Sequence, residues 1–545
     1  MTDGATDATI SALLALGLPE RIALPLQAAL GHDAADIVAS DPWTVLAVAS
    51  VQPERADAYA RSRLGATARP DDQRRQVALL RWLLARAARD GHTVLPQRVA
   101  ELALAGYGVD AKVATGTATA QGEVAEVDWP GGGLALTGLA MAEQAIAEEV
   151  RPRLALDAGA DPVVSDSGGS GRLELITGPA GPARDAAIRG RVAHARADGI
   201  TVMVTAPTLG AAARLSDIAS CPAIPVREAA ALTDASPPPG LLLIEDAHAI
   251  DVNTTAQLLV AHRSVPTVVL AADPLALMSV DGPGDVAGDL AAWLRRTEPA
   301  PDTRPPAPPS RGAVATIDDL VQAVGHGVLP PVESPDKEVV VIPAGDASEA
   351  VHRTLQLVTD AIPRALGIRA TDVMVLTPAV KGVAGAAMLN KALKSRLNPG
   401  RGSTAGFAPG DRVAFIAPVG RAAAGDTGVI ADAPESGLVI DVVGEIVAIP
   451  ERADLPIQPA YALTIARGQA GRWPAVVVVL PGESAGLLCR SLVRTAFSRA
   501  ERHLSVVHAA GPILGRAVTH GYDRRRRTLL GGLLDGEPLK GGPPR

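Results

Sequence analysis

The chain has 545 residues, of which 47% are hydrophobic and 20% are charged, and its net charge is −8. This length predicts about three to five folded units, and the composition excludes a disordered or fibrous protein. The negative charge excludes a protein that coats nucleic acid over its whole surface, although it allows local basic faces.

The N-terminal region, residues 1–118, consists of short predicted helices separated by Gly, Pro and Asp, with the rhythm of paired helix-hairpin-helix units. Such hairpins hold a phosphate backbone through N–H groups at a glycine turn. The second turn, residues 48–52, has no glycine, so a helical bundle that only packs is at least as well supported as DNA contact. The pattern within residues 71–98 predicts an amphipathic helix. Residues 119–156 then predict two short strands around 131–133 and a helix, which is typical of the end of a winged helix.

The next region spans residues 157–298 and begins with a Gly/Ser/Asp-rich linker. After this linker, apolar strands alternate with Ala-rich helices. The predicted strands include residues 202–205, 241–244 and 268–271. Strands that alternate with helices predict a parallel sheet, and ligands bind at the carboxyl ends of such strands.

A Pro-rich linker is predicted at residues 299–338, followed by a second α/β unit. This unit consists of residues 339–406 and 456–530. Residues 407–455 interrupt it, and they are predicted to form a small β-barrel. The arginine run 524–527 is read as a solvated helix face, the usual fate of a charge run.

The stretch LELITGPAGPARD, residues 173–185, has the outline of a phosphate-binding loop. Such a loop reads Gly, four residues, Gly, Lys, and then Ser or Thr, because backbone N–H groups wrap the phosphates, an ammonium reaches them, and a hydroxyl holds magnesium. The same spacing from Gly178 gives Ala183, Arg184 and Asp185. Taken alone, the stretch is better described as an ordinary strand-to-helix turn.

A series of further segments carries a family resemblance. These segments are GHTVLP (91–96), TAPTLGAAARL (205–215), LLLIEDAHAID (241–251), ADPLALMSVDGPGDV (272–286), VLTPAVKGVAGAAMLNKALKSRLNPG (375–400), FAPGDRVAFI (407–416), AYALTIARGQAG (460–471) and RTAFSRAERHL (494–504). Their order and spacing resemble the RecD-like helicases of superfamily one, in the form with an N-terminal helix-hairpin-helix region. The resemblance implies an α/β protein with two RecA-like parallel-sheet domains, an inserted small SH3-like β-barrel, and an N-terminal helical and winged-helix region.

The resemblance also implies a nucleotide site between the two RecA-like domains. The residues that it assigns to the nucleotide are Gly178, Gly181, Arg184, Asp185 and Asp273, and those that it assigns to catalysis are Glu245, Asp246, Gln469 and Arg499. Of the catalytic set, Glu245 and Asp246 are the implied magnesium ligands.

The sequence departs from the family pattern around the nucleotide. The family's loop lysine falls on Arg184, its magnesium-binding hydroxyl falls on Asp185, and its next glutamine falls on Ala276. Pro182 removes an N–H group, and Asp185 places a carboxylate where negative charge must be accepted. The loss of two charge-assisted hydrogen bonds, at about 1.5–3 kcal/mol each, weakens affinity by about two to four orders of magnitude. We therefore expect the loop to be collapsed, with Arg184 paired to Asp185 or Asp246.

The segments that would contact DNA keep the family pattern better. The residues that the resemblance places beside the strand are Thr208, Lys381, Lys391, Arg412, Tyr461 and Thr464. Maintenance of the fold is the alternative role for these residues, since turns need Gly and Pro and barrels need fixed corners. The aromatic content of 2% leaves few rings to stack on bases, so electrostatic contact should dominate.

The sequence leaves two functions open. One is a RecD-like homologue in DNA repair or recombination that holds single-stranded or junction DNA, or a repair protein, with weak or absent ATP hydrolysis. The other is an active ATP-dependent 5′-to-3′ DNA helicase with an atypical loop, in which Glu245 or Asp246 holds Mg²⁺ and Arg499 stabilises the transferring phosphoryl group. ATP and Mg²⁺ are cofactors only in the second case.

The sequence also predicts a cytoplasmic protein without membrane contact. Its two cysteines, Cys221 and Cys489, exclude a disulfide framework and fit a reducing compartment. No stretch has the length and apolar character of a membrane span, and the first residues lack the basic start of a signal peptide.

Overall fold

The computed structural model describes residues 3–154, 172–232, 238–297, 312–400, 406–451, 455–521 and 523–536. The predicted Gly/Ser/Asp-rich linker at the start of residues 157–298, and residues 299–311 of the predicted Pro-rich linker, lie outside these residues. The chain divides into two compact units. The first unit consists of residues 1–147, 282–284 and 526–545, and the second consists of residues 148–281 and 285–525.

The first unit is mainly helical. Its helices are α1 (Asp3–Ala15), α2 (Glu20–Leu30), α3 (Ala34–Ser40), α4 (Pro53–Leu64), α5 (Gln73–Arg89), α6 (Gln97–Ala105), α7 (Ala111–Ala120), the start of α8 (Thr137–Leu154), and α20 (Leu530–Leu534). The predicted amphipathic helix is confirmed as α5, which begins after the capping carboxylate of Asp72 and buries Leu80 and Trp82 in the core.

A small antiparallel sheet follows the helices of this unit, in the order β1-β3-β2. Its strands are β1 (Leu95–Pro96), β2 (Val124–Val127) and β3 (Gly133–Leu136). The two predicted strands and the helix after them are therefore confirmed as β2, β3 and α8. The prediction of a helix for 524–527 was wrong, because this segment is not helical and Arg526 donates to the backbone carbonyl oxygens of Gly282 and Gly284.

The second unit contains two domains, each built on a parallel sheet. A five-stranded parallel sheet, in the order β4-β8-β7-β5-β6, forms the centre of the first of these domains, residues 172–297. Its strands are β4 (Arg172–Thr177), β5 (Val202–Ala206), β6 (Ala223–Pro225), β7 (Leu241–Ile244) and β8 (Thr267–Ala272). Its helices are α9 (Pro182–Ala197), α10 (Leu209–Ala219), α11 (Val226–Ala231), α12 (Val252–Ala261) and α13 (Val286–Thr297). The predicted strands and their parallel pairing are confirmed. Buried residues of α9 and α10 pack on one face of this sheet.

A second parallel sheet, in the order β16-β10-β17-β18-β9, forms the second domain, residues 312–400 and 460–521. Its strands are β9 (Val339–Pro343), β10 (Val373–Thr377), β16 (Ala462–Thr464), β17 (Trp473–Leu480) and β18 (Ala500–His508). Its helices are α14 (Ile317–Gly325), α15 (Ala347–Gln356), α16 (Ile362–Leu366), α17 (Ala386–Leu397), α18 (Arg490–Phe497) and α19 (Pro512–His520). Both faces are buried, since Val476 and Val478 belong to one core while Val477 and Val479 belong to another.

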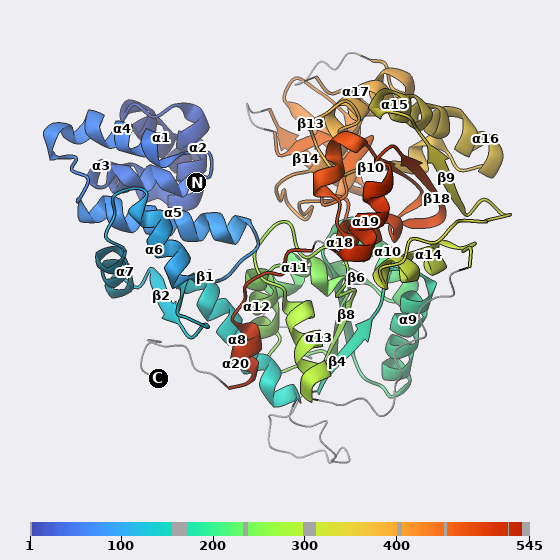
Figure 1. The fold of residues 1–545 in the computed structure, drawn as a ribbon, viewed down its shortest axis with the longest axis horizontal. Coiled ribbons are helices and arrows are strands. Elements are labelled where there is room, and N and C mark those ends of the chain that lie inside the picture. The colour runs from blue at the N-terminus through green and yellow to red at the C-terminus, as the bar shows by residue number, and fades with distance from the viewer. Residues whose placement is uncertain are drawn as a thin grey trace. The chain divides into compact units, whose positions relative to one another are not determined.

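An antiparallel sheet in the order β14-β13-β12-β11-β15 forms the insertion, residues 406–459 (Figure 1). Its strands are β11 (Arg412–Phe415), β12 (Thr427–Asp432), β13 (Gly437–Val442), β14 (Glu445–Pro450) and β15 (Ile457–Pro459). The predicted β-rich insertion is thus present, while its closure into an SH3-like barrel stays a prediction. No helix among the described residues is both long enough and apolar enough to cross a membrane.

Helix α14 lies inside the stretch that was predicted to be linker. Its apolar residues Ile317, Leu320 and Val324 recur with helical spacing, and they are buried in the core of the second domain. Pro-rich flanking sequence dominates the composition of residues 299–338, and this concealed the short amphipathic segment.

We expect the substitution Leu320→Ala to lower the free energy of unfolding by about 2–5 kcal/mol, because it leaves a cavity in that core. Gln322→Ala is the matched control, since Gln322 is exposed on the same helix and its loss should change stability by less than about 0.5 kcal/mol. Urea unfolding of both variants measures the difference. Equal stabilities would mean that α14 does not belong to the core.

Candidate nucleotide and DNA sites

The phosphate-loop candidate connects β4 to α9. Gly178 has a φ of +144°, a conformation that favours glycine, and its N–H donates to the carbonyl of Ala272 at the end of β8. Pro182 is the first residue of α9, so one helix N–H is missing from the turn. A Cβ atom at Gly181 would lie 2.7 Å from a carboxylate oxygen of Asp318, which comes from α14 of the second domain. A carboxylate thus approaches the loop from the opposite domain.

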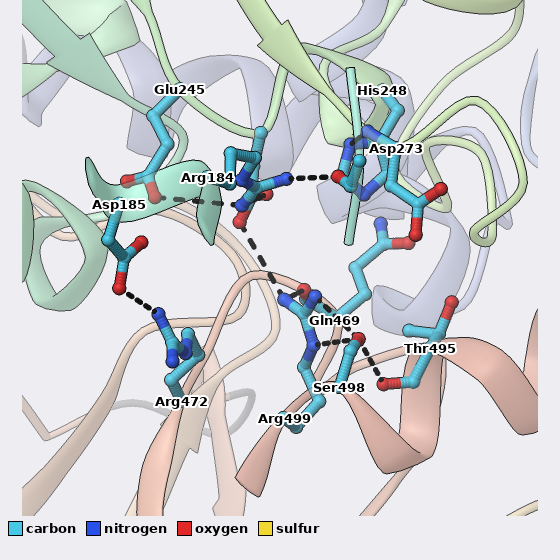
Figure 2. Close-up of polar contacts among 12 residues, drawn as sticks. Arg184, Asp185, Glu245, His248, Asp273, Gln469, Arg472, Thr495, Ser498 and Arg499 are labelled. Carbon is cyan, nitrogen blue, oxygen red and sulfur yellow. Dashed lines mark hydrogen bonds and ion pairs between the residues drawn. The ribbon is translucent and has the colours of Figure 1, made fainter. Parts of the chain in front are cut away.

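The side chain of Arg184 folds back toward the end of β7. Its guanidinium lies 2.5 Å from the Asp246 carboxylate and 3.6 Å from that of Glu245, and it donates to the Gly178 carbonyl at 3.4 Å (Figure 2). Arg184 is 3% exposed, and both carboxylic residues are fully buried. Of the two partners considered for Arg184, the structure selects Asp246, while the collapse of the loop stays a prediction.

Asp185 pairs with residues far away in the sequence. Its carboxylate accepts a hydrogen bond from Arg472 of the second domain at 2.9 Å and lies 4.0 Å from Arg214 on α10. Arg214 also donates to Glu245 at 2.8 Å. The carboxylate at the position of the family's hydroxyl is therefore part of an arginine network.

Arg499 reaches the same cluster from the start of β18. Its guanidinium lies 3.6 Å from Asp246, and it donates to the backbone carbonyl of Gln469 and to the Ser498 hydroxyl. Arg499 and Gln469 are both buried. The structure thus brings all four of the sequence-predicted catalytic residues together.

The buried charges of the cluster influence one another. Burial would raise the pKa of Asp246, but the guanidinium groups of Arg184 and Arg499 hold this pKa well below its usual range. Burial raises the pKa of Glu245, against the opposing charge of Arg214. Burial also lowers the pKa of Arg499 to about 10.

Each carboxylate that would hold magnesium is hydrogen-bonded to a guanidinium group through one oxygen, while Oε2 of Glu245 and Oδ2 of Asp246 accept no hydrogen bond from the residues that the structure describes. Within the described residues, no group of three or more His, Cys, Asp or Glu side chains is arranged to hold a metal ion. A magnesium ion requires carboxylate oxygens that are free to coordinate it. A Mg²⁺ ion with a nucleotide would therefore have to compete with these cations, because Asp246 contacts Arg184 and Arg499 while Oε1 of Glu245 contacts Arg214.

Asp273, at the end of β8, also pairs across the domains. Its carboxylate accepts from Arg494 of α18 at 2.7 Å and from the N–H of Leu275 at 3.1 Å. Its own N–H donates to Nδ1 of His248 at 3.2 Å, and burial lowers the pKa of His248 to about 4. Asp273, which the resemblance assigned to the nucleotide, instead joins the first domain to the second.

Three of the proposed DNA contacts have partners within the protein. Thr208 is buried and caps α10 by accepting from the N–H of Ala211. Tyr461 is buried and donates to Asp411, and Arg412 donates to the Val373 carbonyl at 2.7 Å. Burial lowers the pKa of Arg412 to about 10. These contacts fit the alternative role, maintenance of the fold.

The other three DNA candidates lie nearer the surface. Lys381 and Lys391 are exposed, on the loop after β10 and on α17, and Thr464 is half-buried at the end of β16. Thr464 accepts from the N–H of Arg467. The two lysines are thus the proposed contacts with the freest charge for a phosphate.

The insertion provides a carboxylate to the first domain. The two oxygens of Asp426 accept from the N–H groups of Leu209 and Gly210, at the N-terminus of α10, at 3.0 and 2.9 Å. These N–H groups have no partners within the helix, so the carboxylate satisfies them and interacts favourably with the helix dipole.

Sequence reasoning missed Arg214, Arg472 and Arg494. The only available signal was indirect, since buried carboxylates need cationic partners. The sequence contains many arginines, and only the folded structure selects these three.

Comparison with known proteins shows which family the chain resembles. Residues 3–94 match the family model described as "ATP-dependent RecD2 DNA helicase HHH domain", and residues 156–299 match the one described as "AAA domain". The chain is 27% identical over 552 aligned residues to the ATP-dependent RecD2 DNA helicase of Deinococcus radiodurans, an alignment that covers 90% of this chain and 73% of the relative. The chain is therefore similar to the RecD-like helicases over most of its length. This family in general implies the use of ATP and Mg²⁺.

Solved helicase structures match with low scores. Pif1 helicase from Bacteroides, in complex with ADP-AlF3 and single-stranded DNA, matches with a TM-score of 0.37 and 11% identity over 63% of this chain and 90% of that one. Pif1 helicase from Candida albicans matches with a TM-score of 0.33 and 13% identity over 67% of this chain and 93% of that one. Both scores are too low to bear on the site of this RecD-like chain.

The buried His248 should make stability depend on pH. Its pKa is about 4 in the folded protein and about 6.5 in the unfolded chain, so between these values the unfolded state binds more protons. The stability that its neutral form provides is present above pH 6.5 and is lost as the pH falls. We expect its contribution to decrease by about 2 kcal/mol between pH 7 and pH 5.

Urea unfolding at both pH values measures this decrease. His248→Gln should reduce the difference between the two pH values, whereas the exposed control His352→Gln should keep it. An identical pH dependence in wild type and His248→Gln would contradict the assignment.

Proposed function

We propose that this RecD-like chain binds single-stranded or junction DNA without productive ATP turnover. The observation that carries the proposal is the position of the Arg184 guanidinium, which contacts both Glu245 and Asp246. A family member that hydrolyses ATP needs these oxygens for Mg²⁺ and for polarising water. In this chain the same oxygens stabilise the protein's own cations.

The charge of the surrounding residues supports the same conclusion. A triphosphate in the loop would approach the carboxylate of Asp185, which is fixed by Arg472, and that of Asp318 on the opposite side. Like charges at short distance in a partly buried site repel strongly. Arg184 would also have to leave two buried carboxylates, which is costly because it uncovers their charge.

DNA contact is assigned to the second domain. Lys381 and Lys391 are exposed there, and phosphate contacts of this kind provide most of the affinity for single strands when few aromatic rings are available. We assign this binding to DNA repair or recombination, with repair proteins as partners, on the basis of the family. The relative's printed name, an ATP-dependent RecD2 DNA helicase, supports the DNA substrate class.

The absence of turnover can be measured directly. We expect no ATP hydrolysis above that of Glu245→Gln, with or without single-stranded DNA, because guanidinium groups pair with both carboxylates that would hold magnesium. A colourimetric phosphate assay measures the rate of hydrolysis. The melting temperature with and without millimolar Mg-ATP measures nucleotide binding, because a ligand that binds the folded state must raise the melting temperature. Hydrolysis that DNA stimulates and Glu245→Gln abolishes would instead establish an active helicase.

The proposed DNA face can be tested by charge reversal. We expect Lys381→Glu and Lys391→Glu each to weaken binding of a labelled oligonucleotide, and each to reduce the slope of log affinity against log salt by about 0.7 per lost phosphate contact. Fluorescence anisotropy across a salt series provides both quantities.

Lys112→Glu is the matched control, because Lys112 is an exposed lysine on α7 of the first unit. It should leave both affinity and slope unchanged. Loss of binding in Lys112→Glu, with normal binding in the other two variants, would place the DNA on the N-terminal helices.

A further inference from the structure

Within the part of the chain that the structure describes, four ion pairs join the two RecA-like domains, and all four have the same polarity. The carboxylate comes from the first domain and the guanidinium from the second in every one of them. We call them the closing pairs. They are Asp185–Arg472 (2.9 Å), Asp246–Arg499 (3.6 Å), Asp273–Arg494 (2.7 Å) and Asp281–Arg467 (2.8 Å).

The first-domain carboxylates lie at or beyond the carboxyl ends of the strands. Asp246 follows β7 and Asp273 follows β8, while Asp185 lies in the first turn of α9 after β4. Asp281 lies further along the chain after β8. The first domain therefore presents carboxylates on the edge where a phosphate ligand would require positive charge, and its own Arg184 and Arg214 lie among them.

The guanidinium groups are held in place by their own domain. Arg472 and Arg499 precede the neighbouring strands β17 and β18, and the N–H of Trp473 donates to the carbonyl of Arg499 at 3.0 Å. Arg494 on α18 donates to the Val321 carbonyl of α14. The positive groups are thus positioned as one rigid set opposite the carboxylates.

Two of the closing pairs are almost completely buried, so the loss of either partner would be costly. The side chains of Asp246 and Arg499 are fully buried, and those of Asp273 and Arg494 are at most 3% exposed. A charge in such surroundings that loses its partner is strongly destabilised. If the two domains separated, the carboxylate and the guanidinium of each pair would lose each other as partners at the same time and would both have to be hydrated. The N–H of Leu277, which donates to the Thr495 hydroxyl at 2.8 Å, adds a neutral hydrogen bond beside the Asp273 pair.

We propose that the closing pairs hold the two RecA-like domains together in the free protein, in the role that a bound ligand has in proteins that close around it. In hinge-closing proteins the ligand contributes the contacts that join the two domains. Here the contacts come from the chain itself, so closure requires no nucleotide. The inference builds on the proposed function, but closure is a property that can be measured without DNA or ATP.

Pulsed electron paramagnetic resonance can measure the distance between the domains. Spin labels are attached to Ala187→Cys on α9 and Ser395→Cys on α17, both exposed positions, in a full-length chain that carries Cys221→Ser and Cys489→Ser. We expect one narrow distance distribution in the free protein, and no change on addition of millimolar Mg-ATP. A broad distribution that Mg-ATP narrows would overturn the proposal.

Two arginines of α18 provide a matched comparison. Arg494 pairs across the domains, whereas Arg490, one turn earlier, donates to the carbonyls of Val518 and Thr519 in its own domain. Arg494→Gln should broaden the distribution toward longer distances, and Arg490→Gln should not. A narrow wild-type-like distribution in Arg494→Gln would overturn the proposal.

A more exposed pair gives an independent reading if Arg494→Gln fails to fold. Arg467→Asp places two carboxylates together at Asp281 and should broaden the distribution, and the reciprocal variant Asp281→Arg/Arg467→Asp should restore it. Failure of Arg467→Asp to broaden it would count against the closing pairs. DNA-stimulated hydrolysis together with a narrow distribution in the free protein would overturn the proposed function alone.

Discussion

The guanidinium of Arg184 lies between two fully buried carboxylates, and the rest of the site depends on this position. A buried carboxylate must be paired, because an isolated charge in a weakly polarisable interior is costly. Arg184 and Arg499 neutralise Asp246, and Arg214 supports Glu245. Arg184 lies in the first turn of α9 and also donates to the carbonyl of Gly178, so the pairing of the carboxylates links the loop before α9 to the end of β7. The remaining charge at Asp185 then requires Arg472 from the other domain.

Much of the fold could be predicted from hydrophobic pattern alone. The strand predicted at 241–244 has those bounds in the structure, because four consecutive apolar residues buried on both faces of a parallel sheet leave no ambiguity of register. Helix α5 was equally clear, since its apolar residues recur with helical spacing. The pattern failed for α14, whose nine residues are too few to stand out from their Pro-rich surroundings. It also failed for the 524–527 run, which is not helical and in which Arg526 and Arg527 donate to backbone carbonyls. A short segment takes its structure from what it packs against, and a single sequence does not contain that information.

The candidate site, like the fold, could be predicted from the sequence only in part. The sequence located the carboxylates, the loop and Arg499, because each follows a recognisable strand or motif. It offered two partners for Arg184 and could not choose between them. It could not identify Arg472 as the partner of Asp185, because 287 residues separate them and only tertiary structure brings them together. Arg412 and Tyr461 were expected to contact DNA, yet local geometry directs them to Val373 and Asp411. Long polar side chains have several reachable partners, and the surrounding fold decides among them.

Several residues of the arginine network share partners, so a substitution at one of them changes the contacts of the others. Residues of one ionic network respond to substitution non-additively. Replacing Arg184 by lysine, the family's residue, would shorten the cation's reach while Pro182 and Asp185 stayed in the loop. Replacing Asp185 alone would leave Arg472 without its carboxylate. Each single substitution toward the family's loop thus leaves unpaired a charge that the present network satisfies, so such changes should be tolerated better in combination across both domains than one at a time.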